Sequence, residues 1–338
     1  MIVTLTANPS IDRTVVLDSE LARGGVHRAR GAASDPGGKG VNVARVLTAS
    51  GVQAMAVLPA AEHDPLLEAL TDTGVRYCAV ATSGLARTNI TISEPDGTTT
   101  KINEPGTELT ESTKRELFDV IVDLGRDAAW VALSGSLPPG MPVDWYGQLV
   151  TALRATSCKV AVDTSDAPLL ALAASFPESA PDLIKPNSEE LAQLTGADGD
   201  ELERAAAAGD PTAAVDASRI LLARGVGAVL ATLGSAGAVL VTSDGSWFAS
   251  PPKIDAISTV GAGDSSLAGY ILADIERCTP EDRIRRAVAY GTAATALPGT
   301  TLPNADQVHP ESVSVRALDS PHTLPTSTQP STTQQTLA

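Results

Sequence analysis

The sequence is short of aromatic residues, of lysine and of cysteine. Aromatic side chains make up only 3% of its 338 residues, so a buried core has to be built from aliphatic side chains and alanine. Lysine occurs six times, and 40 acidic residues face 24 basic ones, which gives a formal net charge of −16. An acidic excess of this size excludes a nucleic-acid-binding protein and a polybasic membrane-surface protein.

The three cysteines and four histidines show neither the spacing of a zinc site nor that of a disulfide framework. The sequence does not begin with a basic segment followed by an apolar one, so we expect no signal peptide. Its longest uncharged stretch, 226–243, is interrupted by glycines and polar residues, which predicts two buried strands around a turn. These absences predict a cytoplasmic protein with no membrane span.

Apolar material is plentiful, since 43% of the residues are hydrophobic and 19% charged. Short apolar runs alternate with segments of helical periodicity, which predicts an α/β fold with a mostly parallel sheet and helices on both faces. Strands are expected at 2–7, 54–58, 129–133, 160–163, 183–185, 228–233 and 238–242, and helices at 43–50, 111–124, 188–195, 212–224, 265–276 and 280–297.

Two pairs of short strand-like segments interrupt this alternation. The second pair surrounds the turn residues Glu94-Pro95-Asp96-Gly97, and both pairs are interpreted as short antiparallel strands. They predict a small β-lid formed by about residues 12–35 and 86–105. The strands themselves are expected at 14–18, 28–33, 88–93 and 98–103.

A single domain is expected to span residues 1–310. Residues 311–338 are expected to form a C-terminal extension. From about residue 320 the chain consists mostly of Thr, Ser, Gln and Pro, and residues 320–338 contain no acidic or basic side chain. Such a composition buries too little apolar surface to offset the entropy of ordering, so we expect disorder there.

The sharpest local signal is the segment Thr259-Val260-Gly261-Ala262-Gly263-Asp264 at the start of a predicted helix. Two glycines let successive N–H groups converge, and a helix N-terminus adds partial positive charge, which makes an anion cradle. A carboxylate at the edge of such a cradle can accept the proton of a hydroxyl group that attacks a phosphoryl group. The alternative is that Asp264 only caps the helix after a glycine turn.

A second glycine cluster, Pro36-Gly37-Gly38-Lys39-Gly40-Val41-Asn42, also opens a helix. It is not a P-loop, because Gly40 stands where Ser or Thr is needed, and it lacks the third glycine of a dinucleotide fingerprint. Its functional interpretation is a close approach of the backbone to a polar ligand, with Lys39 and Asn42 as donors. A flexible loop with a solvated lysine is the alternative.

Two further segments follow predicted strands. In Lys185-Pro186-Asn187-Ser188-Glu189-Glu190, the side chains of Asn187 and Glu190 could orient a magnesium ion or its waters, but the same spacing is typical of a helix capping box. The segment Thr232–Gly237 is either a tight turn or a loop that contacts a nucleotide. The sequence leaves both alternatives open.

Taken in their order along the chain, these segments resemble the ribokinase-like (PfkB) carbohydrate kinases, over about residues 1–305. The resemblance implies a three-layer α/β/α sandwich with a mostly parallel sheet of about nine strands and a β-sheet lid over a sugar site. The motifs that carry it are Asn8–Asp12, Gly37–Ala44, Ser134–Pro138, Lys185-Pro186-Asn187 with Glu190, Thr232-Leu233-Gly234 with Gly237, and Thr259–Asp264.

Within the family the chain is most similar to the phosphosugar branch. This implies ATP-dependent phosphorylation of the 6-hydroxyl of D-fructose 1-phosphate to fructose 1,6-bisphosphate, with Mg²⁺. Lys39 stands where relatives that use fructose 6-phosphate tend to have glycine, and Arg87–Ile90 and Lys101–Gly106 resemble the pattern for fructose 1-phosphate and tagatose 6-phosphate. Fructose 6-phosphate and tagatose 6-phosphate remain alternative substrates, and a non-catalytic sugar-phosphate-binding regulator is the alternative of another class. Exposed lid strands are expected to pair into a homodimer.

The same resemblance assigns a role to each candidate residue. Asp264 would be the general base, and the N–H groups of Gly261, Ala262, Gly263 and Asp264 would form the anion hole. The sugar phosphate would contact Asp12, Gly38, Lys39, Asn42 and Ser136, with Arg87 and Lys101 adding positive charge near the lid. The ATP phosphates would lie near Lys185 and Asn187, the nucleotide along Thr232, Gly234, Ser235 and Gly237, and Glu190 would orient Mg²⁺ through water.

Overall fold

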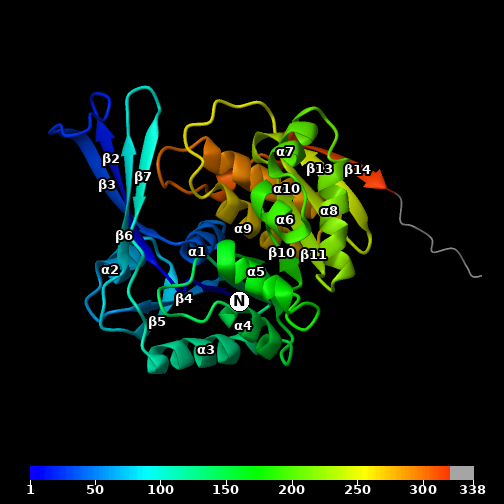
Figure 1. Ribbon diagram of the computed structural model, residues 1–338, viewed down its shortest axis with the longest axis horizontal. Helices are drawn as coiled ribbons and strands as arrows, with labels where there is room; N and C mark the ends of the chain where they lie inside the picture. The colour runs from blue at the N-terminus through cyan, green and yellow to red at the C-terminus, as the bar shows by residue number, and fades with distance from the viewer. Residues whose placement is uncertain (320–338) are drawn as a thin grey trace, which may run out of the picture.

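A ten-stranded sheet and a separate four-stranded sheet form the frame of the computed structural model, which describes residues 1–319 (Figure 1). The large sheet consists of β1 (Ile2–Leu5), β4 (Ala54–Ala60), β5 (Arg76–Ala81), β8 (Trp130–Ser134), β9 (Lys159–Asp163), β10 (Leu183–Ile184), β11 (Ala228–Thr232), β12 (Ala238–Thr242), β13 (Gly245–Ser250) and β14 (Ser314–Asp319). The small sheet consists of β2 (Ser10–Leu17), β3 (Ala29–Gly37), β6 (Arg87–Ser93) and β7 (Thr99–Asn103).

Most of the large sheet is parallel, as the alternation of strands and helices predicted. The strands in the order β11-β10-β9-β8-β1-β4-β5 run parallel to one another. Beyond β11, the strands β12, β13 and β14 continue the sheet as antiparallel neighbours. The loops that follow the parallel strands therefore gather at one edge, where open α/β sheets bind their ligands.

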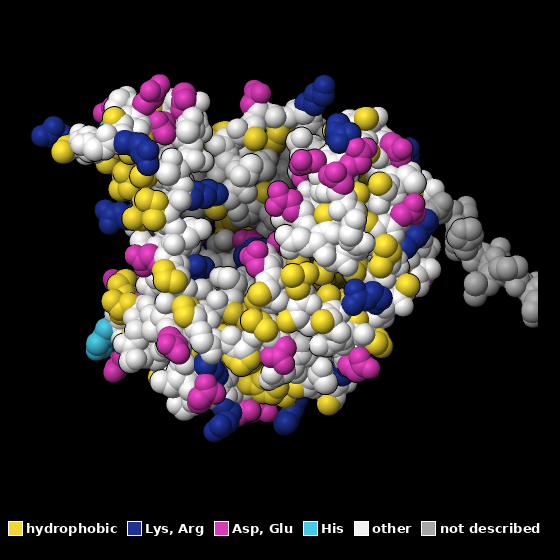
Figure 2. Space-filling model, in the orientation of Figure 1, with side chains coloured by type: hydrophobic (Ala, Val, Ile, Leu, Met, Phe, Trp, Pro, Cys, Tyr) yellow, Lys and Arg dark blue, Asp and Glu magenta, His cyan; other side chains and the backbone are white. Residues whose placement is uncertain are grey.

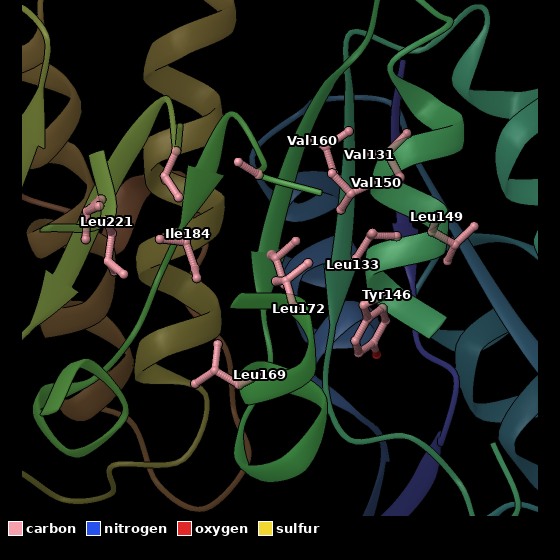
Figure 3. Packing of buried hydrophobic residues seen from close by; sticks show 14 of the residues in the cluster. Val131, Leu133, Tyr146, Leu149, Val150, Val160, Leu169, Leu172, Ile184 and Leu221 are labelled. Atoms are coloured by element: carbon pink, nitrogen blue, oxygen red, sulfur yellow. The ribbon is translucent and has the colours of Figure 1, made fainter. Parts of the chain in front are cut away.

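Helices cover both faces of the large sheet and give the expected three-layer sandwich (Figure 1). The side chains buried between the layers are mainly aliphatic; Figure 3 shows Leu149 of α4 beside Leu133 of β8 in one of the two core clusters. One layer contains α1 (Lys39–Ala49), α2 (Pro65–Asp72), α9 (Ala262–Ile275) and α10 (Pro280–Thr295), and the other contains α3 (Glu111–Gly125), α4 (Trp145–Leu153), α5 (Asp166–Ala174), α6 (Ser188–Thr195), α7 (Gly199–Ala207) and α8 (Thr212–Ala223).

The first helix begins at Lys39, within the second glycine cluster, and not at Val43 as its periodicity predicts. A side chain at Gly40 would overlap the carbonyl oxygen of Leu5, so glycine lets α1 lie directly against β1. The Oγ1 atom of Thr6 accepts a hydrogen bond of 2.8 Å from the N–H of Val41 in the first turn. These contacts fix the first turn of α1 at the carboxyl edge of the sheet.

The segments that were expected to form the lid make up the four-stranded sheet, and the pairing between its two hairpins was not predicted. The pairs β2–β3 and β6–β7 are antiparallel hairpins, whereas β2 and β6 run parallel to each other. The reason is that each hairpin follows a strand of the parallel main sheet, so both leave its carboxyl edge in the same direction. Figure 1 shows the lid standing away from the sandwich.

The large sheet continues past residue 310, where the domain was expected to end. The strand β14 pairs antiparallel with β13, and Val313 just before it is 2% exposed. The C-terminal extension expected at 311–338 therefore begins with an edge strand of the sheet, because its apolar residues pack on the core. The disorder expected from about residue 320 concerns residues outside the described range. Within residues 1–319, no helix is long and apolar enough to cross a membrane.

Candidate active site

Asp264 lies in the first turn of α9, directly after the glycine turn. Gly261 precedes the helix in the left-handed conformation, with φ of 75°, and the first turn leaves N–H groups without intrahelical partners. Asp264 is 6% exposed, and its Oδ2 accepts a hydrogen bond of 2.9 Å from Nδ2 of Asn42 in α1. This contact joins the two glycine clusters that the sequence singled out.

The environment of Asp264 suits a proton acceptor. Burial raises the pKa of its carboxyl, and the negative charge of Asp163 raises it further, to about 6, although Lys39, Lys185 and the Asn42 hydrogen bond act in the opposite direction. A carboxyl group with this pKa is mostly ionised at neutral pH and is more basic than an exposed aspartate. The alternative that Asp264 only caps the helix is wrong, because Gly261 is the N-cap residue of α9 and no side chain among residues 1–319 makes a capping hydrogen bond there.

Asp163, the last residue of β9, is a site residue that the sequence interpretation missed. It is 1% exposed, and its carboxylate lies 2.8 Å from Nζ of Lys39 and 3.1 Å from Nζ of Lys185. Lys185 and Lys39 hold the pKa of Asp163 below its usual value despite the opposing effect of burial. We name these three residues the Lys39–Asp163–Lys185 bridge. A carboxylate that ends a buried parallel strand was the available signal, because such strand ends line ligand sites.

The charges of the bridge offset the acidity of the whole chain locally. Lys39 and Lys185 carry two positive charges against the two negative charges of Asp163 and Asp264, so this group is formally neutral while the chain carries −16. Burial alone would lower the pKa of Lys39, but Asp163 and Asp264 hold it above its usual value. Lys39 therefore stays charged in the range where phosphates are dianions.

The predicted sugar-phosphate residues gather where the lid meets the large sheet. Nη2 of Arg87 lies 3.5 Å from Oγ of Ser136, and Nδ2 of Asn8 lies 3.4 Å from the same hydroxyl. Arg87 also donates a hydrogen bond of 2.9 Å to the carbonyl oxygen of Glu104. Burial lowers the pKa of its guanidinium, but an arginine remains protonated at neutral pH. These donors could bind a phosphate group.

Asp12 is held in place by its neighbours in the lid. Its Oδ1 accepts hydrogen bonds from Oγ of Ser10 at 2.7 Å and Nδ2 of Asn89 at 3.0 Å. A side chain at Gly37 on the adjacent strand would overlap the Asp12 carboxylate, so glycine is needed there. Asn89, which the sequence interpretation missed, is signalled only by its register opposite Asp12.

Lys101 is less closely integrated than the other predicted residues. The register pairs it with Thr91, two positions from Asn89, so it shares the face of the lid that carries Asp12. Its side chain is exposed and takes part in none of the ion pairs found among residues 1–319. Figure 2 shows a hollow between the lid and the sandwich. Thr14, on the same face as Asp12, would lie 3.7 Å from a Cβ atom at Gly299, so this face of the lid is turned towards the sandwich.

Lys185 and the segment after it lie beside the cradle. A Cβ atom at Gly263 would lie 3.1 Å from Nζ of Lys185, so the ammonium group contacts the first turn of α9. Asn187 and Glu190 form the capping box of α6: the Asn187 Oδ1 accepts from the N–H of Glu190 at 2.8 Å, and the Glu190 Oε2 accepts from the N–H of Asn187 at 2.9 Å. The capping interpretation is thus confirmed, and it leaves Glu190 buried near the bridge, where burial raises its pKa.

The predicted nucleotide loop lies next to the same segment. Asn187 pairs with Thr232 in a short parallel bridge, and a 3-10 turn at Gly234–Ala236 follows. Gly234 and Ser235 are exposed, whereas Gly237 is buried with φ of 114°. A side chain at Gly237 would overlap the carbonyl oxygen of Ala249, so the turn can only close on glycine.

A buried carboxylate at a helix N-terminus, close to two lysines from different parts of the chain, is an arrangement that suits phosphoryl transfer in an α/β protein. Residues 5–307 match the family described as pfkB family carbohydrate kinase. The chain therefore belongs to this family, and it is an ATP-dependent sugar kinase.

Named relatives cover most of the chain. It is 36% identical over 287 residues to a 1-phosphofructokinase of Xanthomonas campestris pv. campestris. The aligned residues make up 84% of this chain and 87% of the relative. It is 31% identical over 307 residues to the ATP-dependent 6-phosphofructokinase isozyme 2 of Escherichia coli, covering 89% and 94%. The crystal structure of the Escherichia coli phosphofructokinase-2 in complex with substrates and products superposes with a TM-score of 0.80 at 30% identity, covering 90% of this chain and 96% of that one.

Proposed function

We propose that the protein transfers the γ-phosphoryl group of ATP to the 6-hydroxyl of D-fructose 1-phosphate, which gives fructose 1,6-bisphosphate and ADP. The observation that carries this proposal is the position of Lys39, which lies in the glycine cluster of the sugar side and is paired with Asp163 next to Asp264. The similarity to relatives named 1-phosphofructokinase supports the choice of sugar.

The proposed chemistry uses the residues described above in separate roles. The carboxylate of Asp264 accepts the proton of the 6-hydroxyl, while the hydroxyl oxygen bonds to the γ-phosphorus and the bond to the β,γ-bridging oxygen breaks. The N–H groups at the start of α9 and Nζ of Lys185 face the phosphoryl oxygens. Arg87, Ser136 and Asn8 bind the 1-phosphate at the base of the lid.

The donor set near Glu190 fits a magnesium ion that keeps its waters. One carboxylate oxygen of Glu190 is occupied by the N–H of Asn187, and within residues 1–319 no group of three or more His, Cys, Asp or Glu could hold a metal ion. Mg²⁺ is commonly held by one carboxylate and the substrate phosphates. Glu190 would hold the ion through water, and the ion would neutralise charge on the ATP phosphates.

A substrate panel tests the proposed sugar. We expect kcat/KM for fructose 1-phosphate to exceed the values for fructose 6-phosphate and tagatose 6-phosphate in an assay coupled to ADP release. Discrimination by one well-placed phosphate contact is worth about 10²-fold or more. A higher value for either 6-phosphate would overturn the sugar assignment, and binding without turnover of all three would favour the sugar-phosphate-binding regulator.

The pH dependence of the reaction follows from the pKa of Asp264. We expect kcat/KM to fall as the pH is lowered through about 6, because protonation of Asp264 removes the base. A raised carboxyl pKa makes the folded state bind the proton more tightly than the unfolded state, so protonation of this group alone does not destabilise the fold. The loss should therefore be reversible and occur without a change in far-ultraviolet circular dichroism. We call this fall of kcat/KM at low pH the acid limb. An acid limb near pH 4 would contradict the role of Asp264.

The lid also supports a homodimer. Alternation along the strands places Ile11, Val15, Ile90 and Ile102 on the face of the lid opposite Asp12, and Ile102 is 53% exposed. Arg13 lies on the same face, opposite Ile90. Pairing of two such faces around a two-fold axis would cover their apolar side chains.

Sedimentation velocity at micromolar concentration is expected to show a dimer of the wild-type protein. The variant Ile102→Lys should dissociate it, because an ammonium group cannot be buried unpaired in the interface. Ile220→Lys is the matched control: Ile220 is an exposed isoleucine of α8, away from the lid. A wild-type monomer would contradict the proposal.

We also propose a cytoplasmic location, where ATP is available and the three free cysteines remain reduced.

A further inference from the structure

The carboxylate of Asp163 lies between two ammonium groups that come from separate parts of the site. Its Oδ1 is 2.8 Å from Nζ of Lys39, and its Oδ2 is 3.1 Å from Nζ of Lys185. Lys39 is the first residue of α1, in the glycine cluster of the sugar side. Lys185 follows β10 and lies under the cradle, near Gly263. One buried carboxylate thus sets the separation between two lysines, which the proposed function assigns to the sugar side and to the ATP side.

The two lysines are not equally buried. The side chain of Lys39 is 37% exposed and that of Lys185 only 5%. Burying an ammonium group costs free energy that an ion pair does not always recover, so a carboxylate with two lysines is weak evidence for a purely stabilising role. The partial exposure of Lys39 leaves donor positions of its ammonium group open to a ligand in the cleft.

The backbone around Asp163 is tied to the sugar side as well. Its carbonyl oxygen accepts a hydrogen bond of 2.9 Å from the N–H of Gly135, the residue before Ser136. Oγ1 of Thr164 donates a hydrogen bond of 2.9 Å to the carbonyl oxygen of Gly135. A shift of Asp163 would therefore also move the loop that carries Ser136, and the carboxylate has a rigid support.

We propose that Asp163 is a positioning residue of the phosphoryl transfer, whose two carboxylate oxygens hold Lys39 against the sugar-phosphate side and Lys185 against the ATP side of the group in transit. The inference rests on the proposed phosphoryl transfer but not on which sugar phosphate is the acceptor. Asp163 itself contacts no reacting atom. It acts by fixing two positive charges before the substrates bind, so that little reorganisation is needed during the reaction.

The arrangement also links Asp163 to the proton acceptor. The charged groups that face Asp264 are Asp163, Lys39 and Lys185, with Asn42 as a hydrogen-bond donor, and Glu190 lies near the same lysines. Removing the negative charge of Asp163 removes a repulsion and leaves both ammonium charges uncompensated. Each change favours the ionised form of Asp264, so the acid limb of the reaction should move to lower pH.

The variant Asp163→Asn tests this inference, because asparagine keeps the shape and removes the charge. We expect kcat to fall by about 10²-fold, the size of effect that a displaced positioning group can produce. We also expect the acid limb of kcat/KM to move down by about half a pH unit or more. The matched control is Asp274→Asn: Asp274 is 7% exposed, accepts hydrogen bonds from Trp130 and Lys159, and pairs with Arg283 near the other end of α9.

The control variant separates a positioning role from a structural one. Asp274→Asn should lower the melting temperature while its kcat and acid limb stay at the wild-type values. If Asp163→Asn lowers the melting temperature by a similar amount but leaves the acid limb in place, Asp163 only supports the fold and the inference is wrong. A wild-type kcat for Asp163→Asn would overturn it as well.

A second variant covers the case in which Asp163→Asn does not fold. Asp163→Glu keeps the charge but moves the carboxylate by one methylene, so kcat should fall about tenfold or more while the acid limb stays near that of the wild type. An unchanged kcat in this variant would contradict the positioning role.

The kcat and kcat/KM values of all variants are compared with those of the wild type on the sugar phosphate that the wild-type enzyme prefers in the substrate panel. A different preferred sugar would overturn the proposed function and leave the test of Asp163 intact.

Discussion

Replacing Asp264 by asparagine is expected to lower kcat by about 10²–10⁴-fold, the usual contribution of a general base. The substitution keeps the size of the side chain, and the asparagine oxygen can still accept the hydrogen bond from Nδ2 of Asn42. ATP should therefore bind with nearly wild-type affinity, which isothermal titration can measure beside the coupled assay. The same variant should also lose the acid limb near pH 6, because the group that titrates there is gone.

The control for Asp264→Asn lies on the same helix. Asp274 is the other buried carboxylate of α9, and it contacts Lys159 and Arg283 instead of the lysines of the bridge. Asp274→Asn should lower stability and leave kcat unchanged. If Asp264→Asn retains wild-type turnover, Asp264 is not the general base.

Replacing Gly40 by alanine is expected to impair stability and activity together. The added Cβ would overlap the carbonyl oxygen of Leu5, so α1 has to move away from β1. Such overpacking typically costs about 1–3 kcal/mol. The shift also carries Lys39 and Asn42, which lie in the same helical turn, away from Asp163 and Asp264. A displacement of about 1 Å can lower kcat by about 10²-fold.

Gly147→Ala is the matched control for Gly40→Ala. Gly147 also lies within a helix, α4, but a Cβ there would make only ordinary contacts at 3.6 Å or more. This variant should be neutral or stabilise the protein by about 0.5–1 kcal/mol. Thermal unfolding and the coupled assay measure both variants. A fully active and stable Gly40→Ala would show that α1 does not depend on its close approach to β1.

Much of the fold could be predicted from the sequence because its elements carry strong local signals. The helix at Ser188–Thr195 has the predicted bounds, since its capping box and Gly196 mark both ends. Elements without such signals were missed. The strand Gly245–Ser250 is interrupted by small polar residues, and helix α5 buries apolar residues without a distinct polar face. The parallel pairing of β2 with β6 could not be inferred, because it depends on the positions of β1 and β5 in the large sheet, which the two hairpins follow.

The candidate site was predictable where a residue type and its spacing imply chemistry. Asp264 and Asn42 were both named, but their hydrogen bond joins residues 222 positions apart, and no sequence pattern states such a pairing. Asp163 was assigned to a strand and given no role, because its meaning comes from two lysines that reach it from elsewhere. Lys101 was predicted from the resemblance of Lys101–Gly106 to the family pattern, and the structure leaves it exposed on the lid.

The parallel pair at the centre of the lid has a consequence for folding. The strands β2 and β6 belong to segments separated in the chain by β3, α1, β4, α2 and β5, so the proposed sugar-binding face exists only after these elements have assembled. Contacts of this sequence separation form late, because they close a long loop. A partly folded chain therefore has no complete lid. Sugar phosphate, by binding only the finished arrangement, would draw the folding equilibrium towards it.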